Sequence, residues 1–563
     1  MNPTVQKKAR KGKGNPVFPW IPALLPVFLS LLFFLPVLRN GFVNWDDPDF
    51  IANNPHIRGL NPSNLSWMFS ASVSNYWAPL TWLSLSLDYA LGGNDPRAYH
   101  LDNLLLHLLN VFLVFIVSRR LLELSDVGPK PRSINAVWAT ASASLTALLF
   151  GLHPLRVESV AWASERKDVL CAFFFLLSLR IYLETPAKPG WRRWPIWACL
   201  GSFLLALMAK PMAVTLPFLF LLLDAWPLGK LRADPARALL EKIPFFALAL
   251  AASAVAAAHL PADPHGLYLS LPFRVMHCFG AITFYLGKTV VPLGLHPFYP
   301  YTGGFNPFSL SNILSFLIVA LVTWACWLLR RQKPWLGASW LYFILTLLPV
   351  LGLLQNGSQA FADRYTYLPS LAPLLAGAGC LAAALRARPA AFYAAALLAG
   401  LGLGILTARQ TGIWENSMVF WEDVVRAYPD AYYLPHANLA ETCLESGDLG
   451  RAEREFAKAE ALTSDDAFCH LRRGIALGQL GRLGEAVVEF RKAATLEPFN
   501  PEPLLGLALA FLDLGRKAPA LEALRRARAL SHPGPSLYRE LAWGFERAGS
   551  PAEAAACRAK AGQ

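Results

Sequence analysis

The sequence is poor in charged residues and lacks the paired cysteines of common metal and redox sites. Only 16% of its 563 residues are charged, whereas 55% are hydrophobic, and the mean hydropathy is +0.37. A soluble chain of this length needs far more polar surface to cover its core. The eight cysteines contain no C-x-x-C, so neither a zinc site nor a redox pair is indicated. The composition therefore predicts a membrane protein.

The net charge of +13 could suggest nucleic-acid binding, but the placement of the basic residues favours another explanation. Outside the C-terminal region, most of them lie in short clusters beside apolar runs of about twenty residues, the length of helix that crosses a ~30 Å hydrocarbon core. Clusters of this kind mark the cytoplasmic loops of membrane proteins. We therefore interpret the basic clusters as a signal of membrane topology, and we expect no nucleic-acid partner.

Eleven apolar runs predict about eleven transmembrane helices within a membrane domain of residues 17–409. Residues 1–16 are expected to form a basic cytoplasmic tail, and the first run is too long and lacks the cleavage site of a signal peptide. The expected spans are residues 17–39, 101–118, 134–152, 168–183, 194–209, 212–227, 243–260, 309–329, 335–354, 369–385 and 390–408.

Residues 276–295 are also apolar enough to cross the membrane. A full crossing there would place the later cluster of Arg330, Arg331 and Lys333 outside, against the usual distribution of charge. We expect a re-entrant or interfacial helix on the outer face. A full crossing that is compensated elsewhere is the alternative.

Residues 410–563 carry more charge and a repeat of 34 residues. Gly447, Gly481, Gly515 and Gly549 follow this spacing, as do two series of alanines. This is the tetratricopeptide period, in which glycine permits the turn between two helices and alanine lets them approach closely. We predict a connecting helix within 410–432 and repeats over 433–563, starting near 433, 467, 501 and 535. The charge pattern places the repeats outside the cytoplasm.

The long first outer loop, residues 40–99, carries Asp46, Asp47 and Asp49 close to the membrane boundary. Adjacent carboxylates near a low-dielectric surface repel each other and lose hydration, which raises at least one pKa and suits that group to accept a proton. We hypothesise that Asp46 or Asp47 is a catalytic base. The alternative is a solvated turn at Asp-Asp-Pro.

Two further outer segments, 151–170 and 355–370, concentrate charge beside apolar runs. Such charge is costly unless the groups pair or face a polar cavity, and an arginine can hold a phosphate through two N–H groups. Salt-bridged loop residues, and a lysine that reaches toward the membrane surface, are the alternatives. The candidate substrate-binding residues are His153, Glu158, Arg166, Asp168, Lys210, Arg364 and Tyr365.

These features together suit the transfer of a sugar from a lipid phosphate. A base deprotonates the acceptor hydroxyl, cations hold the phosphate leaving group, and an apolar groove admits the prenyl chain.

The sequence also resembles the transmembrane and tetratricopeptide-repeat O-mannosyltransferases and their bacterial relatives. The segments that carry the resemblance precede the 34-residue repeats and are FVNWDDPDFIANNP, YWAPLTWLSLSLDYALGGNDPRAYHLDNLLLHLLN, GLHPLRVESVAWASERKDVL, KPMAVTLPFLFLLLD and ADRYTYLPS. The resemblance implies an all-α fold, with a GT-C-type transmembrane domain followed by an α-solenoid of tetratricopeptide repeats. It also implies a polyprenyl-phosphate sugar as donor.

By position, the resemblance assigns the catalytic acid to Asp46 or Asp47 and a lipid-phosphate contact to Arg364. It assigns the acid and cation of the second loop to Glu158, Arg166 and Asp168. Arg156 departs from the residue expected at its position. No cofactor is certain, and a divalent metal is open but not indicated.

The expected activity is therefore that of a membrane glycosyltransferase that acts at the extracytoplasmic face and transfers a sugar to an acceptor hydroxyl. In the eukaryotic members of the family this hydroxyl belongs to a protein. Its partners would be the membrane lipid donor and a protein bound by the repeats. Alanine- and proline-rich spans and compact loops favour a bacterial inner-membrane protein with periplasmic repeats. An undecaprenyl-phosphate sugar is then as good a candidate donor as the dolichyl phosphate mannose of the eukaryotic members. An O-antigen polymerase or ligase and a non-catalytic scaffold are the alternatives.

Overall fold

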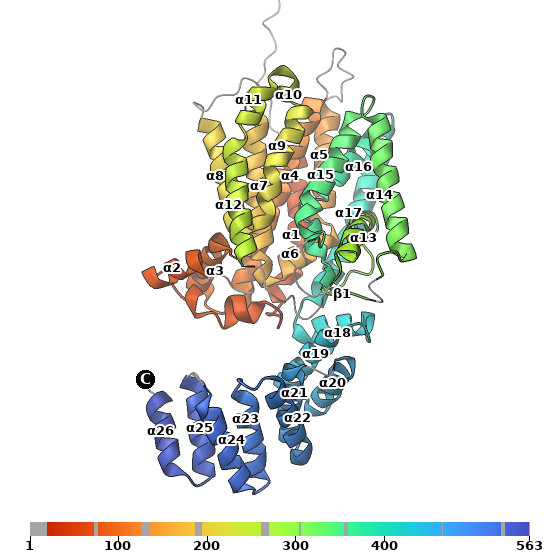
Figure 1. Cartoon of the computed structure of the whole chain (residues 1–563). Coiled ribbons are helices and arrows are strands. Elements are labelled where there is room, and N and C mark those ends of the chain that lie inside the picture. The colour runs from red at the N-terminus through yellow and green to blue at the C-terminus, as the bar shows by residue number, and fades with distance from the viewer. Residues whose placement is uncertain are drawn as a thin grey trace, which may run out of the picture.

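The computed structural model describes residues 20–71, 77–125, 136–185, 194–259, 269–302, 306–353, 359–463, 466–530 and 535–561. The predicted basic tail, 1–16, lies outside these residues. Over the described residues the protein is almost entirely helical, which confirms the all-α fold (Figure 1). The two described strands, β1 (Tyr299–Pro300) and β2 (Gln359–Phe361), form one short antiparallel pair.

Each of the eleven predicted apolar runs forms a helix, and these helices build one bundle (Figure 1). Among the described residues, five helices are long and apolar enough to cross a membrane, or six if α5 and the bent segment that follows it are counted as one span; four shorter apolar helices accompany them. The chain is thus a multi-pass membrane protein, while the number of eleven crossings stays a prediction. The helices are α1 (Trp20–Phe34), α4 (Pro96–Ser125), α5 (Ala136–Gly151), α7 (Arg166–Glu184), α8 (Trp194–Ala209), α9 (Leu216–Ala225), α12 (Ile243–Ala258), α14 (Leu310–Leu329), α15 (Pro334–Leu347), α16 (Leu371–Ala384) and α17 (Pro389–Ile413).

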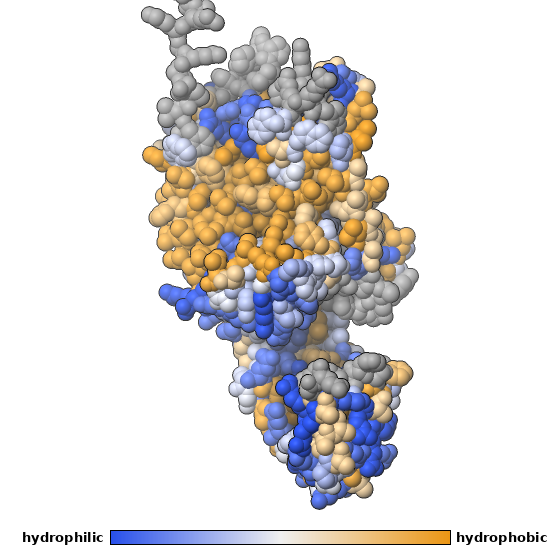
Figure 2. Space-filling view, turned by 90° about the vertical axis from the view of Figure 1, so that its left-hand side faces the viewer, coloured by the Kyte–Doolittle hydropathy of each residue, from blue (hydrophilic) through white to orange (hydrophobic). Residues whose placement is uncertain are grey.

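The surface of the bundle carries a broad hydrophobic band with hydrophilic residues at both ends (Figure 2). The ends differ in what they carry (Figure 1). The end that faces the repeats holds α2 (Pro62–Ser70), α3 (Pro79–Gly92) and α6 (Val157–Ala161), whereas the opposite end holds α10 (Lys230–Ala233) and α11 (Pro235–Leu240). The first outer loop and the repeats therefore lie on the same side of the hydrophobic band, as their predicted topology requires.

Helix α13 (Leu271–Val290) covers most of the ambiguous segment and lies across the repeat-facing end of the bundle (Figure 1). Near its start, His277 hydrogen-bonds to the carbonyl oxygen of Ala360, and near its end the carbonyl oxygen of Thr289 lies 3.0 Å from the ring of His153. Both partners belong to outer segments. A helix that crossed the membrane would have its two ends at opposite faces, so these contacts favour the expected interfacial helix over the alternative of a full crossing.

The C-terminal region is a row of antiparallel helix pairs, preceded by the connecting helix α18 (Ser417–Ala427). Gly447, Gly481, Gly515 and Gly549 all have positive φ, between 73° and 82°, which confirms their predicted place in the turns. The pairs are α19 (Tyr433–Glu445) with α20 (Leu449–Leu462), α21 (Ala467–Gln479) with α22 (Leu483–Leu496), α23 (Glu502–Asp513) with α24 (Lys517–Ala529), and α25 (Pro535–Arg547) with α26 (Pro551–Ala561).

Candidate functional site

The two adjacent acids of the first outer loop have different surroundings. Asp47 is buried, and its two carboxylate oxygens accept the backbone N–H groups of Val43 at 2.9 Å and Ser164 at 3.0 Å. Burial raises the pKa of Asp47 to about 6, although these N–H groups act in the opposite direction. Because both oxygens are occupied, Asp47 ties the first loop to the second outer segment.

Asp46 keeps an accessible edge. Its side chain is 23% exposed, and its Oδ2 lies 3.5 Å from Nζ of the buried Lys167. Burial of the rest of the group raises the pKa of Asp46, whereas Lys167 lowers it. Of the two aspartates, Asp46 is therefore the one whose carboxylate can reach a second molecule, and the geometry favours it as the base.

Lys167 leads from Asp46 into a buried network of charges. Its Nζ lies 3.1 Å from Glu165, and Glu165 also lies 3.4 Å from Lys210 and 3.2 Å from Arg364. Burial alone would raise the pKa of Glu165, but the three cations hold it below its ordinary value. Glu165, at the end of the short helix Ala163–Glu165, is thus an ionised centre that gathers cations from three separate elements.

Two further acids complete this ion cluster. Glu158, in α6, accepts the backbone N–H of Arg364 at 2.8 Å and is ion-paired with its guanidinium. Asp168, in α7, is ion-paired with Lys210. We define the ion cluster as Asp46, Glu158, Glu165, Lys167, Asp168, Lys210 and Arg364. Its four acids and three cations come from the first loop, the second outer segment, the start of η6 (Pro211–Thr215) and η8 (Asp363–Thr366).

Aromatic rings line the cations of the cluster. Lys167 lies over the rings of Phe50 and Trp162, with 4.6 Å between its Nζ and the Phe50 centroid. Arg364 lies over Trp162 and Tyr365, at 5.3 Å and 4.9 Å. Aromatic faces stabilise desolvated cations, so the positive groups stay together where few water molecules can reach them.

Two predicted substrate-binding residues lie elsewhere. Arg166 donates to Asp88 and Asp102, each at 2.7 Å, and so ties α7 to α3 and α4. His153 accepts the N–H of Leu155, and its other ring nitrogen hydrogen-bonds to the carbonyl oxygen of Thr289. Arg166 and His153 therefore make contacts within the protein and lie outside the ion cluster, and their contact with a ligand stays a prediction.

Lys167 and Glu165 are central to the cluster but were not selected from the sequence. The only available signal was their place in the run of charges from Glu165 to Asp168. Neighbouring residues at a helix start point in different directions, about 100° apart, and the sequence does not indicate which of Arg166 and Lys167 faces the site.

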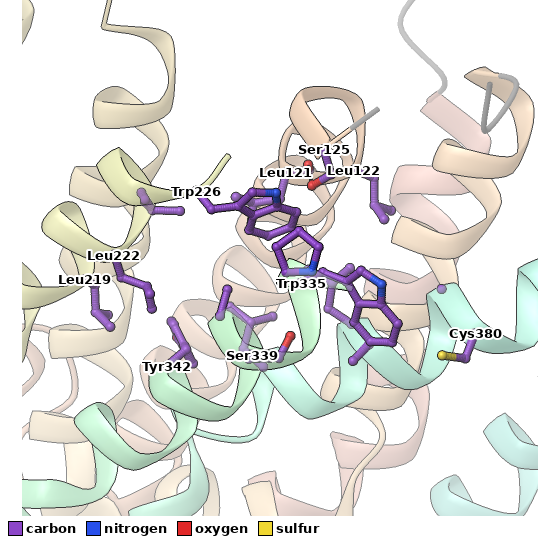
Figure 3. A pocket seen from close by; sticks show the side chains of 18 of the residues that line it. Leu121, Leu122, Ser125, Leu219, Leu222, Trp226, Trp335, Ser339, Tyr342 and Cys380 are labelled. Carbon is purple, nitrogen blue, oxygen red and sulfur yellow. Dashed lines mark hydrogen bonds between the residues drawn. The ribbon is translucent and has the colours of Figure 1, made fainter. Parts of the chain in front are cut away.

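An apolar cavity of about 490 Å³ is lined by residues of α4, α7, α9, α15 and α16, and it reaches Trp226 and Gln332 at the end of the bundle that carries α10. Its walls include Leu179 of α7, Leu219 of α9, Tyr342 of α15 and Leu371 of α16, and the side chains of Trp226, Trp335 and Tyr342 project into it (Figure 3). Lys167 and Asp168 stand at the start of α7, Lys210 shortly before α9, and Arg364 shortly before α16. Three of the five helices that line the cavity, α7, α9 and α16, thus begin at or near the cluster, although the cluster residues themselves do not line it.

One group among the described residues has the geometry of a metal site, and it lies in the repeats. Glu460, His470 and Glu489 offer ligand atoms within 4.8 Å of one another. Both carboxylates already contact cations: Lys492 lies 2.8 Å from Glu460 and 3.2 Å from Glu489, and Arg473 contacts both. The arrangement is explained by ion pairing between repeats.

Curated relatives of the chain are protein O-mannosyltransferases. It is 32% identical over 236 residues to the mouse protein O-mannosyl-transferase TMTC4, a match that covers 38% of this chain and 31% of the relative. It is 31% identical over 215 residues to Tmtc1 of Drosophila melanogaster, which covers 37% of this chain and 23% of that protein. The chain thus matches less than a third of the length of these relatives.

Other comparisons add little. No protein-family model matches the chain. A crystal structure of MamA covers 27% of this chain and 89% of its own, at 20% identity and a TM-score of 0.24. The resemblance to the transmembrane and tetratricopeptide-repeat O-mannosyltransferases, noted from the sequence, is confirmed by the curated relatives.

Proposed function

We propose that this protein is a membrane glycosyltransferase that moves a sugar from a polyprenyl-phosphate carrier to an acceptor hydroxyl, on a protein. The observation that carries the proposal is the partly exposed side chain of Asp46 beside Lys167, in a cluster whose other buried cations are Lys210 and Arg364. The similarity to proteins named O-mannosyltransferases supports the reaction class and makes mannose a candidate sugar.

The cluster has the groups that a sugar transfer of this kind requires. The acceptor oxygen forms a bond to the anomeric carbon of the sugar, and the bond from that carbon to the phosphate oxygen breaks. Asp46 takes the proton of the acceptor hydroxyl, and a positioned base contributes about 10²–10⁴-fold to such a rate. The bonding electrons leave with the polyprenyl phosphate.

The cations stabilise this leaving phosphate. Lys210 and Arg364 are already desolvated and held in place by Glu158, Glu165 and Asp168. Charges that are fixed in advance in a low-dielectric site stabilise a developing anion without reorganising when it forms. Arginine adds the option of two parallel N–H contacts to phosphate oxygens.

The apolar cavity is the proposed seat of the prenyl chain. Its walls are mostly leucine, alanine and aromatic residues, and its volume lies in the range of ordinary ligand sites. Because α7, α9 and α16 run from the cluster along this cavity, a prenyl chain that lay along these helices would have its tail in the cavity and its phosphate near Lys210 and Arg364.

The reaction is proposed to occur at the extracytoplasmic face, in bacteria the periplasmic side of the inner membrane. The positive charge of the opposite loops supports this orientation. Alkaline phosphatase fused after Gln563 should be active in cells. Activity of a cytoplasmic reporter at that position would contradict the orientation.

The test of the function is Asp46→Asn, with Asp49→Asn as the matched control. Asp49 stands three residues away and is exposed. Transfer from radiolabelled polyprenyl-phosphate mannose in membranes with equal protein levels should fall by about 10²–10⁴-fold in the first variant and stay unchanged in the second.

Equal transfer by the Asp46 variant and the wild type would refute the proposal. The polymerase-like or scaffold alternatives would then take its place. An undecaprenyl-phosphate sugar panel run in parallel identifies the sugar if mannose is not transferred by the wild type.

A further inference from the structure

The hydrophobic core of the transmembrane bundle continues through the first repeat and includes Ala476 of the second, whereas the later repeats have a core of their own. A single hydrophobic core runs from the bundle through Trp421 of α18 and Leu439 of α19 to Phe456 of α20. The remaining repeats are built on a separate core, which extends from Leu471 to Cys557. The boundary between the two cores therefore lies within the second repeat, although the change in sequence character falls near residue 410.

At this junction, Asn44 of the first outer loop is held by α18 and α19. The indole N–H of Trp421 donates to Oδ1 of Asn44 at 2.5 Å, and Nδ2 of Asn44 donates to Oγ1 of Thr442 at 3.0 Å and to the carbonyl oxygen of Asn438 at 3.3 Å. The backbone N–H of Asn44 donates to Oγ of Ser417 at 2.9 Å. Both functional groups of the side chain are thus engaged by residues nearly 400 positions away.

The neighbouring residues strengthen the junction. Gly41 donates its backbone N–H to the carbonyl oxygen of Glu415 at 2.8 Å. The ring of Trp45 packs against Trp421 and Phe298, with centroids 5.2 Å and 5.4 Å apart. The chain segment that leads directly into Asp46 is therefore fixed by polar and aromatic contacts on the side of the repeats.

We infer that α18 and the first repeat are part of the proposed active site, and that Asn44 is the positioning residue through which they hold Asp46 beside Lys167. This inference rests on the proposed function. It gives the repeat region a second role beside the binding of an acceptor, because loss of the junction would displace the base itself.

The structure explains why such a support is needed. Asp46 is followed by Asp47, whose bonds to Val43 and Ser164 fix the loop on the membrane side only. A displacement of about 1 Å between reacting groups can lower a rate by about 10²-fold. The contacts of Asn44 fix the loop on its other side, just two residues before the base.

The experiment compares Asn44→Ala and Thr442→Val in the full-length protein. The valine keeps the size of Thr442 and removes its hydroxyl, at a position remote in sequence from the loop. Asn500→Ala is the matched control, because Asn500 also makes side-chain hydrogen bonds, but only to Glu497 and Glu502 in the repeats. Two quantities are measured: kcat and KM for the radiolabelled donor, and deuterium exchange of peptides that cover residues 41–50.

Asn44→Ala should lower kcat by about tenfold to a hundredfold with little change in the donor KM, and Thr442→Val should lower it less. Deuterium exchange in residues 41–50 should rise in both junction variants and stay unchanged in the Asn500→Ala control. Unchanged kcat and exchange in both junction variants, while Asp46→Asn still abolishes transfer, would overturn the positioning role and leave the proposed function intact. Full transfer by Asp46→Asn would overturn both.

Discussion

Two clusters of buried charge stand at opposite ends of the bundle, and they differ in balance and access. The inner cluster consists of Asp224, Lys230, Glu241 and Lys242, with Lys242 2.6 Å from Asp224 and 2.9 Å from Glu241, and none of its side chains is more than 5% exposed. The hydroxyl of Tyr182 donates to Asp224 at 2.5 Å.

The outer ion cluster has one more acid than cations, and Asp46 remains 23% exposed. Buried ions are costly unless they are paired, so a closed and balanced set serves to hold helices together. The surplus group of the outer cluster is an acid, and the exposed edge of Asp46 allows that acid to accept a proton from a ligand. The comparison therefore indicates a structural role for the inner cluster and supports the proposed role of the outer one.

The largest effect on stability is expected in the inner cluster. Lys242→Met leaves Asp224 and Glu241 without their shortest cation contact, and removal of one member of a buried ion pair costs about 3–5 kcal/mol. A denaturant titration of the purified protein in detergent measures this loss. Asp224→Asn combined with Lys242→Met should recover part of it, and no loss in the single variant would show that the inner cluster is dispensable.

Arg364→Lys tests the outer cluster with the positive charge retained. Lysine cannot form two parallel contacts to one phosphate, and hydrogen bonds to charged groups contribute about 1.5–3 kcal/mol. We expect the KM for the donor to rise by about tenfold or more, with a smaller change in the free energy of unfolding than for Lys242→Met. An unchanged donor KM would exclude a phosphate contact by Arg364.

Lys167→Met should change the pH dependence of transfer. A base must be deprotonated, so the rate rises as the pH increases through the pKa of Asp46, which burial holds above its ordinary value. Lys167 lowers this pKa, and its removal should move the rising limb of the pH–rate profile to higher pH. A limb that stays in place would mean that another group is the base.

The smallest effect is expected for an exposed ion pair at the same end as the inner cluster. Arg119 and Glu123 in α4 lie 3.0 Å apart, with side chains 22% and 37% exposed. Glu123→Gln should change the free energy of unfolding by about 0.3–0.5 kcal/mol, because pairs four residues apart on a helix surface contribute little. A loss as large as that of Lys242→Met would remove the distinction between buried and exposed pairs.

Much of the architecture follows from local pattern. Apolar runs of about twenty residues are sufficient to predict helices, because a backbone in hydrocarbon must satisfy its own hydrogen bonds. The 34-residue spacing predicted the turns, and Gly447 and its three equivalents adopt the positive φ that favours glycine. Asp46, Glu158, Asp168, Lys210, Arg364 and Tyr365 were also selected from the sequence and lie in or beside the cluster.

Other features depend on contacts between distant segments. Asp46 and Asp47 cannot be distinguished chemically in the sequence. In the structure they differ, because the N–H groups of Val43 and Ser164 bind both carboxylate oxygens of Asp47. Arg166 and Lys167 are adjacent cations whose side chains point in different directions at the start of α7. Lys167 contacts Asp46 in the ion cluster, whereas Arg166 contacts Asp88. Burial and partner choice are properties of the packed chain, so no local pattern specifies them.

The sequence by itself determined a multi-pass helical bundle, a solenoid of helix pairs and the outer segments in which the charges gather, because hydrophobic length and repeat spacing act locally. Only the tertiary structure decided that Asp46 keeps the accessible carboxylate, that Glu165 draws the cations together, and that Asn44 joins the first loop to the first repeat. Those outcomes depend on contacts between side chains that lie hundreds of residues apart in the sequence, and the packing of the whole chain determines these contacts.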